Sequence, residues 1–165
     1  MILSKIYKNT LLILAACLVL TACATKKEVA TTPQIEGQMQ SDVYTGDDTV
    51  KYLADGVPDR VFFATNETIL TTASRETLRA QAAWLRKNSS INVVLEGHAD
   101  ERGTREYNLA LGERRANAAR DYLMTYGISG KRISVISYGK EKPINPASTP
   151  LAWSQNRRSV TVKVN

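Results

Sequence analysis

Between residues 60 and 97, the spacing of apolar positions is first typical of a strand, then of a helix, and then of a strand again. Residues 60–64 form a short apolar run, and residues 91–96 are rich in β-branched side chains and close at Gly97. Both runs are expected to be strands. Between them, apolar residues recur at helical spacing behind Thr71 or Thr72, and either threonine can cap a helix.

A longer helix is expected from residue 104 onward. Thr104 is a suitable N-cap, Glu106 in the first turn suits the helix dipole, and Gly127 ends the pattern. The positions that repeat at spacings of three and four should form the buried face of this helix: Leu109, Gly112, Ala116, Ala119, Leu123 and Tyr126.

The rest of the chain adds two strands and a short helix. Residues 132–138 read as a third strand, residues 139–150 as a loop with three prolines, and a short helix is expected near Trp153. The alternation over 159–164 indicates a strand with one buried face. The order βαβαβ(α)β predicts an α/β domain of the α+β type, with helices packed on a mixed four-stranded sheet.

The first residues have the pattern of a secretory signal. Lys5 and Lys8 precede an apolar run over 11–20, which is too short for a bilayer core that takes about 20 residues. Residues 20–23 resemble the lipobox of bacterial lipoproteins, which implies cleavage after residue 22 and lipidation of Cys23. Ala24 would favour sorting to the outer membrane. An ordinary cleavage site that contains a cysteine is the alternative.

Residues 23–55 are expected to be a lipidated N-terminus and a flexible tether. They are rich in Thr, Gln, Asp and Gly, they lack sustained apolar periodicity, and Pro33 interrupts them. Such a segment cannot bury enough apolar surface to offset its ordering entropy. The globular domain is therefore assigned to residues 56–165.

Charge and cysteine content exclude several function classes. The net charge of +6 would suit nucleic acid, an anionic membrane or an acidic polymer, but a lipoprotein signal places the domain outside the cytoplasm, so no nucleic acid is expected. Cys17 leaves with the signal and Cys23 takes lipid, which leaves no cysteine nucleophile or ligand. His98 is the sole histidine, so neither a metal nor another cofactor is predicted.

The densest cluster of charge lies in residues 96–115. Asp100 falls in the expected loop and Arg115 well inside the expected helix, and together they can face one small zwitterionic ligand. Helical spacing places Asn108, Leu111 and Arg115 on one face. The alternatives are a surface ion pair of Arg115 with Glu113 or Asp121 and a loop-capping role for Asp100, and His98 is expected to be structural.

Residues 96–115, 137–143 and 156–158, taken with the lipobox and tether, closely resemble the peptidoglycan-associated lipoproteins of the OmpA-like domain family. The resemblance covers about residues 58–164. It implies non-covalent binding of peptidoglycan stem peptides at meso-diaminopimelate and a tether between outer membrane and cell wall. It also implies membership of the Tol-Pal system, which serves envelope integrity and cell division, with TolB and other Tol proteins as partners.

The resemblance also assigns roles to residues. Asp100 would hold the ligand's ammonium and Arg115 its carboxylate, since a guanidinium fork fits carboxylate geometry. Leu111 would floor the pocket, Asn108 would brace the loop, and Arg102 matches a further contact residue. Family members often have an aromatic residue or leucine followed by Asp where this chain has Thr65 and Asn66. These two are kept as expected contacts, with a changed affinity.

A peptidoglycan-remodelling enzyme is the competing hypothesis. The sequence offers no Ser-His-Asp set, cysteine nucleophile or metal cluster to support it, so a non-catalytic role is predicted. Asp100→Ala or Arg115→Ala is expected to abolish cell-wall binding and to leave the fold intact.

Overall fold

A four-stranded mixed sheet lies at the centre of the computed structural model, which describes residues 42–164. The strand order is β3 (Arg60–Phe62), β6 (Arg158–Val164), β4 (Asn92–His98) and β5 (Ile133–Gly139). β6 runs antiparallel to both of its neighbours, whereas β4 and β5 are parallel. The predicted mixed sheet is thus confirmed. The predicted signal peptide, Cys23 and residues 24–41 lie outside the described residues.

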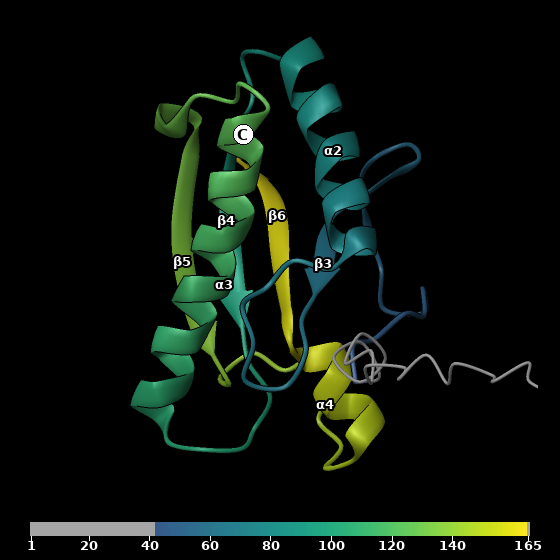
Figure 1. Cartoon of the computed structure of the whole chain (residues 1–165), viewed down its shortest axis with the longest axis vertical. Helices are drawn as coiled ribbons and strands as arrows, with labels where there is room; N and C mark the ends of the chain where they lie inside the picture. The colour runs from purple at the N-terminus through teal and green to yellow at the C-terminus, as the bar shows by residue number, and fades with distance from the viewer. Residues whose placement is uncertain (1–41, 165) are drawn as a thin grey trace, which may run out of the picture. The chain divides into compact units, whose positions relative to one another are not determined.

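Two helices cover one face of this sheet (Figure 1). They are α2 (Thr72–Lys87) and α3 (Arg105–Thr125), and a short α4 (Pro150–Asn156) precedes β6. A 3-10 turn, η1 (Gly130–Arg132), leads into β5. The hydroxyl of Thr104 accepts from the Tyr107 amide at 3.2 Å, which confirms the predicted cap of α3, and Thr71 rather than Thr72 caps α2. Within residues 42–164, no helix is long and apolar enough to cross a membrane.

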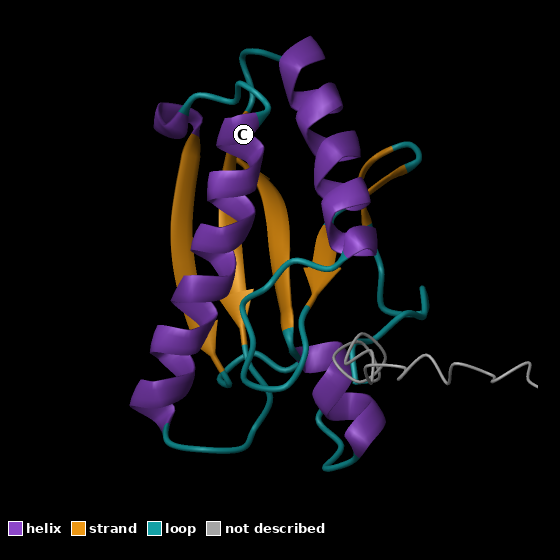
Figure 2. Cartoon of the chain, in the orientation of Figure 1, coloured by secondary structure: helices purple, strands orange, loops and turns teal. Residues whose placement is uncertain are grey.

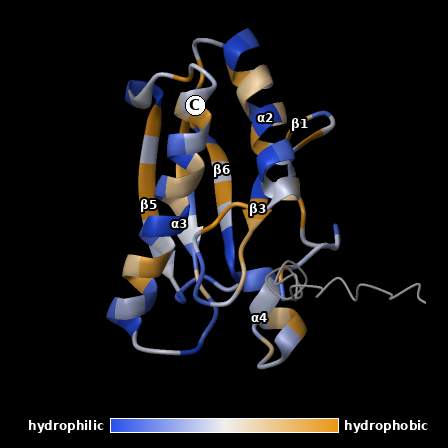
Figure 3. Ribbon diagram, viewed as in Figure 1, coloured by the Kyte–Doolittle hydropathy of each residue, from blue (hydrophilic) through white to orange (hydrophobic). Residues whose placement is uncertain are grey.

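The hydrophobic core lies between the sheet and the two helices. β5 is largely hydrophobic, β6 is hydrophobic in its upper part and hydrophilic at its lower end, and α2 and α3 alternate hydrophobic and hydrophilic turns (Figure 3). The core joins β3, α2, β4, α3 and β5 through Val61, Phe63, Leu78, Leu85, Leu95, Leu123 and Ile133. Most of the predicted stripe of α3 is buried, and only Leu109 and Tyr126 at its ends are half-buried.

Two strands differ from their predicted form. β4 continues through Gly97, where it was expected to close, and ends at His98. β6 is buried on both faces from Arg158 to Thr161 and exposed beyond, instead of alternating throughout. The Thr161 hydroxyl donates to Gln81 of α2 at 2.7 Å on one face, and charged side chains crowd the other. The predicted alternation of buried and exposed residues is therefore wrong for both ends of β6.

The predicted boundary between tether and domain is wrong for residues 42–55. β1 (Tyr52–Ala54) pairs with β2 (Val57–Pro58), as the loops and strands of Figure 2 show, and Leu53 is buried. The Tyr44 ring packs edge-on against Phe62 with centroids 4.8 Å apart. These are isolated apolar anchors rather than a periodic pattern, so the sequence carries no periodic signal for them.

Helix α3 touches the sheet most closely where two glycines face each other. A Cβ added to Gly97 would lie 1.8 Å from the carbonyl oxygen of Gly112, a distance that no packed structure tolerates. We expect Gly97→Ala to lower the free energy of unfolding by about 2 kcal/mol, because α3 must shift away from β4. Urea denaturation checks this.

Gly130→Ala is the matched control for that prediction. An added Cβ there meets only the flexible end of Met124, at 3.4 Å. Its unfolding free energy should stay within about 0.5 kcal/mol of wild type. Equal stability of the Gly97 and Gly130 variants would contradict the close approach.

Candidate functional site

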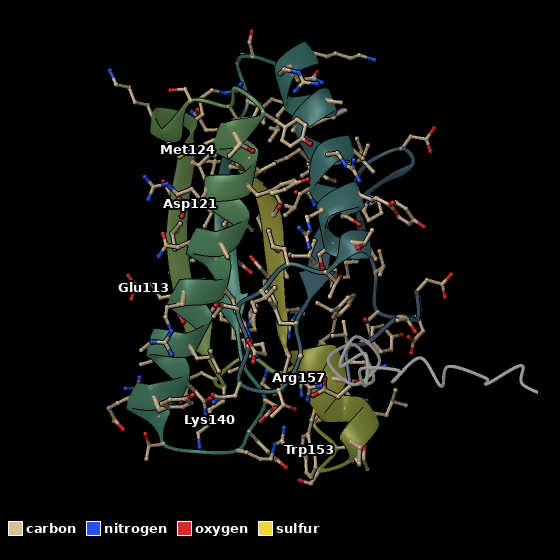
Figure 4. All side chains as sticks on the ribbon, in the orientation of Figure 1. Glu113, Asp121, Met124, Lys140, Trp153 and Arg157 are labelled. Carbon is tan, nitrogen blue, oxygen red and sulfur yellow. The ribbon has the colours of Figure 1, made fainter. Side chains whose placement is uncertain are left out.

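The carboxyl ends of the parallel strands β4 and β5 meet at one end of the sheet, where α/β folds commonly bind ligands. The loop after β4 starts at Ala99, and the loop after β5 is tied to it by Lys140, whose Nζ donates to the Gly103 carbonyl at 2.7 Å. Figure 4 places Lys140, Trp153 and Arg157 at this same end. Charged side chains therefore gather where the topology exposes two strand ends.

A cavity of about 260 Å³ opens at this end, in front of the first turns of α3. It brings together every predicted contact residue except Arg115, along with Gly103 and Tyr107. Its lining residues are Thr65, Asn66, Asp100, Arg102, Gly103, Tyr107, Asn108 and Leu111. The sequence thus located the cavity from residues that lie up to 46 positions apart, in a loop, a turn and a helix.

Asp100 is 7% exposed and already paired. Arg102 donates to it from Nη2 at 2.7 Å and from Nε at 3.1 Å, and Arg157 Nη1 adds a contact at 3.4 Å. Burial alone would raise the pKa of Asp100, but the hydrogen bonds and charges of the two arginines lower it below its usual range. The carboxylate is therefore ionised at neutral pH and neutralised by two guanidinium groups.

Arg102 is the more accessible partner of this pair. Its side chain is 43% exposed, and its guanidinium lies over the Trp153 ring, 4.5 Å from the centroid. Nη2 also contacts the Thr65 hydroxyl at 3.3 Å. Arg102 consequently forms the rim that separates the cavity from a neighbouring hollow of about 620 Å³ beside α4.

Arg115 is fully buried and lies behind the cavity rather than on its wall. Its guanidinium donates to three backbone carbonyls, those of Glu67 at 2.9 Å, His98 at 2.9 Å and Ala64 at 3.0 Å. Burial lowers the pKa of Arg115 to about 10, which still leaves it charged. The alternative that Arg115 forms a surface ion pair is therefore wrong. Direct binding of a ligand carboxylate by Arg115 stays a prediction.

The remaining predicted residues shape the cavity. Asn108 Nδ2 donates to the Arg102 carbonyl at 2.8 Å, which confirms that it braces the loop, and Leu111 is 5% exposed at the cavity wall. Asn66 adopts a left-handed backbone conformation with φ of 60° and accepts a hydrogen bond from the Tyr107 hydroxyl. Asn tolerates this conformation better than most residues do.

Two residues beside the predicted site were not predicted from the sequence. Tyr107 is 43% exposed at the cavity and precedes Leu111 by one helical turn, so the spacing that found Leu111 could have found it. Arg157 was not assigned to the site either, and it contacts the carboxylates of Asp100 and Asp42 at 3.4 Å each. Its burial, 3% exposed, makes it part of the wall behind the site.

Comparison with known proteins agrees with this architecture. Residues 62–157 match the OmpA family. A "Peptidoglycan-associated lipoprotein" of Agrobacterium fabrum (strain C58) is 42% identical over 159 residues, which cover 96% of this chain and 89% of the relative. One of Rhizobium meliloti (strain 1021) is 56% identical over 106 residues, 64% of this chain, and the match spans only 60% of that relative's length.

A solved structure of a similar protein has the same fold. The crystal structure of the peptidoglycan-associated lipoprotein from Burkholderia pseudomallei superposes with a TM-score of 0.63 at 34% identity, covering 64% of this chain and 90% of the other. The sheet, its two covering helices and the cavity at the strand ends therefore define a domain of the OmpA type. The chain belongs to the OmpA family and, within it, to the peptidoglycan-associated lipoproteins.

Proposed function

We propose that this protein is an outer-membrane lipoprotein, anchored through Cys23, that binds the diaminopimelate of peptidoglycan stem peptides and so ties the membrane to the cell wall. The observation that carries the proposal is the cavity at the strand ends, where a buried carboxylate, an accessible guanidinium and an apolar wall meet. TolB and other Tol proteins are its proposed partners in the envelope, on the strength of the family membership.

The free end of diaminopimelate carries an ammonium beside a carboxylate. Asp100 takes the ammonium, because it is the one carboxylate among the described residues that line this cavity and it is ionised at neutral pH. The ammonium replaces part of the charge that Arg102 now supplies. Arg102 is freed in the same step and turns toward the ligand's carboxylate, which a planar guanidinium can bind in a bidentate way.

Arg115 contributes from behind the cavity. A guanidinium carries five N–H groups, and the three carbonyl bonds of Arg115 leave two of them for a ligand. Direct contact requires residues 64–67 to move, since their carbonyls cover the side chain in the structure. In either case its positive charge favours a carboxylate at this end of the cavity.

The cavity suits binding better than hydrolysis. Hydrolysis of a glycosidic bond takes a pair of carboxyl groups, and acyl transfer takes a nucleophile with an adjacent base. Among the described lining residues, Asp100 is the single carboxylate, and two arginines hold it ionised. We therefore infer a non-catalytic role.

The second carboxylate of diaminopimelate provides the test. A stem peptide with lysine at the same position keeps the ammonium and lacks that carboxylate. We expect the purified protein to bind the diaminopimelate peptide about tenfold more tightly, because one charge-assisted hydrogen-bond pair is lost with lysine. Isothermal titration with both peptides measures this.

Equal affinity for the two peptides would remove the proposed role of the arginines. Incubation of the protein with purified sacculi, followed by chromatography of the muropeptides, provides the control for catalysis. An unchanged muropeptide profile is the expected result.

A further inference from the structure

A second polar cavity lies on the opposite face of the sheet from α2 and α3. Its volume is about 370 Å³. Val93 and Leu95 of β4 belong to the core, so the alternate residues Glu96 and His98 point away from the helices. These two meet residues from β3, β6 and the loop after β5, and the lining includes Arg60, Lys142, Arg158 and Val160.

Arg158 at this cavity is a buried cation that makes no close ion pair among the described residues. It is 6% exposed, and within residues 42–164 no carboxylate lies within 4.0 Å of its guanidinium nitrogens. Its contacts are two backbone carbonyls, those of Lys142 at 3.1 Å and Asn156 at 3.4 Å, and Nε has no partner among the described residues. Burial and the charge of Arg60 lower its pKa to about 10, the more distant charges of Glu96 and Asp59 oppose this shift, and the guanidinium remains charged. A buried charge left in this state favours an anion beside it.

His98 shows the same lack of partners. It is 2% exposed, and neither of its ring nitrogens makes a hydrogen bond of good geometry among the described residues, although the Lys142 backbone lies close enough to raise the pKa of the ring slightly. Burial and then the charges of Arg158 and Arg60 lower its pKa to about 3, so the ring is neutral. A neutral imidazole can donate one hydrogen bond and accept another. The cavity therefore holds unused polar atoms on two buried side chains.

The charges around the cavity are unbalanced toward positive. Asp59 is neutralised by Arg60, whose Nε and Nη2 bind its two oxygens at 2.7 and 2.8 Å. Glu96 is then the other acidic lining residue, and its carboxylate lies 3.7 Å from His98 Nε2. Its single negative charge faces the positive charges of three further lining residues, Arg158, Lys142 and Lys51. Lys142 is exposed and lines the cavity, and its Nζ lies 3.6 Å from the centre of the Tyr138 ring.

We propose that this cavity binds a phosphate group that carries a free hydroxyl, namely inorganic phosphate or a phosphate monoester. Arg158 and Lys142 neutralise the anion, and the His98 ring supplies a hydrogen bond from the buried side. Glu96 would repel a fully ionised anion, but it accepts a hydrogen bond from a protonated phosphate oxygen. The site therefore prefers phosphate to sulfate, which has no proton to donate at neutral pH.

This site and the cavity at Asp100 share no lining residue. The phosphate experiment therefore tests other side chains than the wall-binding proposal does, and its failure would leave that proposal untouched.

Titration of the full chain with inorganic phosphate, followed by heteronuclear NMR at constant ionic strength, tests the proposal. We expect saturable shifts at His98 and its neighbours, and at least tenfold weaker binding in Lys142→Gln and in Arg158→Gln. Lys87→Gln, an exposed lysine at the far end of α2, is the matched control and should bind as wild type does. Lys142→Gln keeps the test valid if Arg158→Gln does not fold, because Lys142 is exposed.

Two further arms identify the ligand. Sulfate in place of phosphate should bind at least fivefold more weakly, and Glu96→Gln should remove that difference. Vesicles of phosphatidic acid in phosphatidylcholine separate a lipid monoester from the free ion, and binding to either probe through Lys142 supports the site. The absence of saturable shifts with both probes, or wild-type affinity in Lys142→Gln, would overturn the proposal.

Discussion

Replacing Arg115 by alanine should lower the free energy of unfolding by about 4 kcal/mol, a loss large enough to threaten the fold. The side chain is fully buried and joins α3 to two backbone segments that are distant in sequence, residues 64–67 and the end of β4, through the carbonyls of Ala64, Glu67 and His98. Alanine would leave the carbonyls of Glu67 and His98 without the donor that Arg115 supplies, whereas the Ala64 carbonyl keeps the Glu67 amide as a donor, and it would leave a cavity where the guanidinium lay. Urea denaturation followed by circular dichroism measures the change.

Arg114→Ala is the natural control, because Arg114 is the adjacent residue and its side chain is exposed. Its unfolding free energy should stay within about 0.5 kcal/mol of wild type. A loss below about 1 kcal/mol in Arg115→Ala would show that the three carbonyls find other donors. The structure thus changes the expectation from the sequence that this variant keeps its fold, and wall binding by Arg115→Ala is informative only beside its measured stability.

Local chemistry explains which parts of the fold were predictable. Thr71 and Thr104 each accept a backbone amide three residues ahead, an interaction that depends on neighbouring residues alone. The buried stripe of α3 follows from its own spacing. The hairpin at β1 and β2 was missed, because Tyr44 and Leu53 are single anchors whose partners lie elsewhere in the chain.

The candidate site shows the same division. Helical spacing placed Asn108 and Leu111 at one cavity, since both lie on α3. The same spacing could not show that Arg115, one turn further on, is buried, because its partners are backbone carbonyls of two other segments. Every residue type has a backbone carbonyl, so no acidic partner in the sequence indicates that the Arg115 guanidinium is buried.

Replacing Asp100 by asparagine should weaken binding of the diaminopimelate peptide about 100-fold. Asparagine keeps the size of the side chain but loses the charge that pairs with the ligand's ammonium. It also removes the negative charge that neutralises Arg102 and the buried Arg157. The ligand's ammonium would therefore be repelled by two guanidinium groups that have lost this counter-ion. Isothermal titration measures the affinity, and thermal unfolding of the same sample separates it from misfolding.

Asp121→Asn controls for the general loss of one negative charge, because Asp121 is exposed on α3 and far from the cavity end of that helix (Figure 4). It should bind as wild type does. Because Arg102 and Arg157 keep the pKa of Asp100 below its usual range, wild-type affinity should also persist as the pH falls toward that lowered pKa and decline only below it. Wild-type affinity in a folded Asp100→Asn protein would show that the ammonium is held elsewhere, and would separate the cavity at the strand ends from the binding of the cell wall.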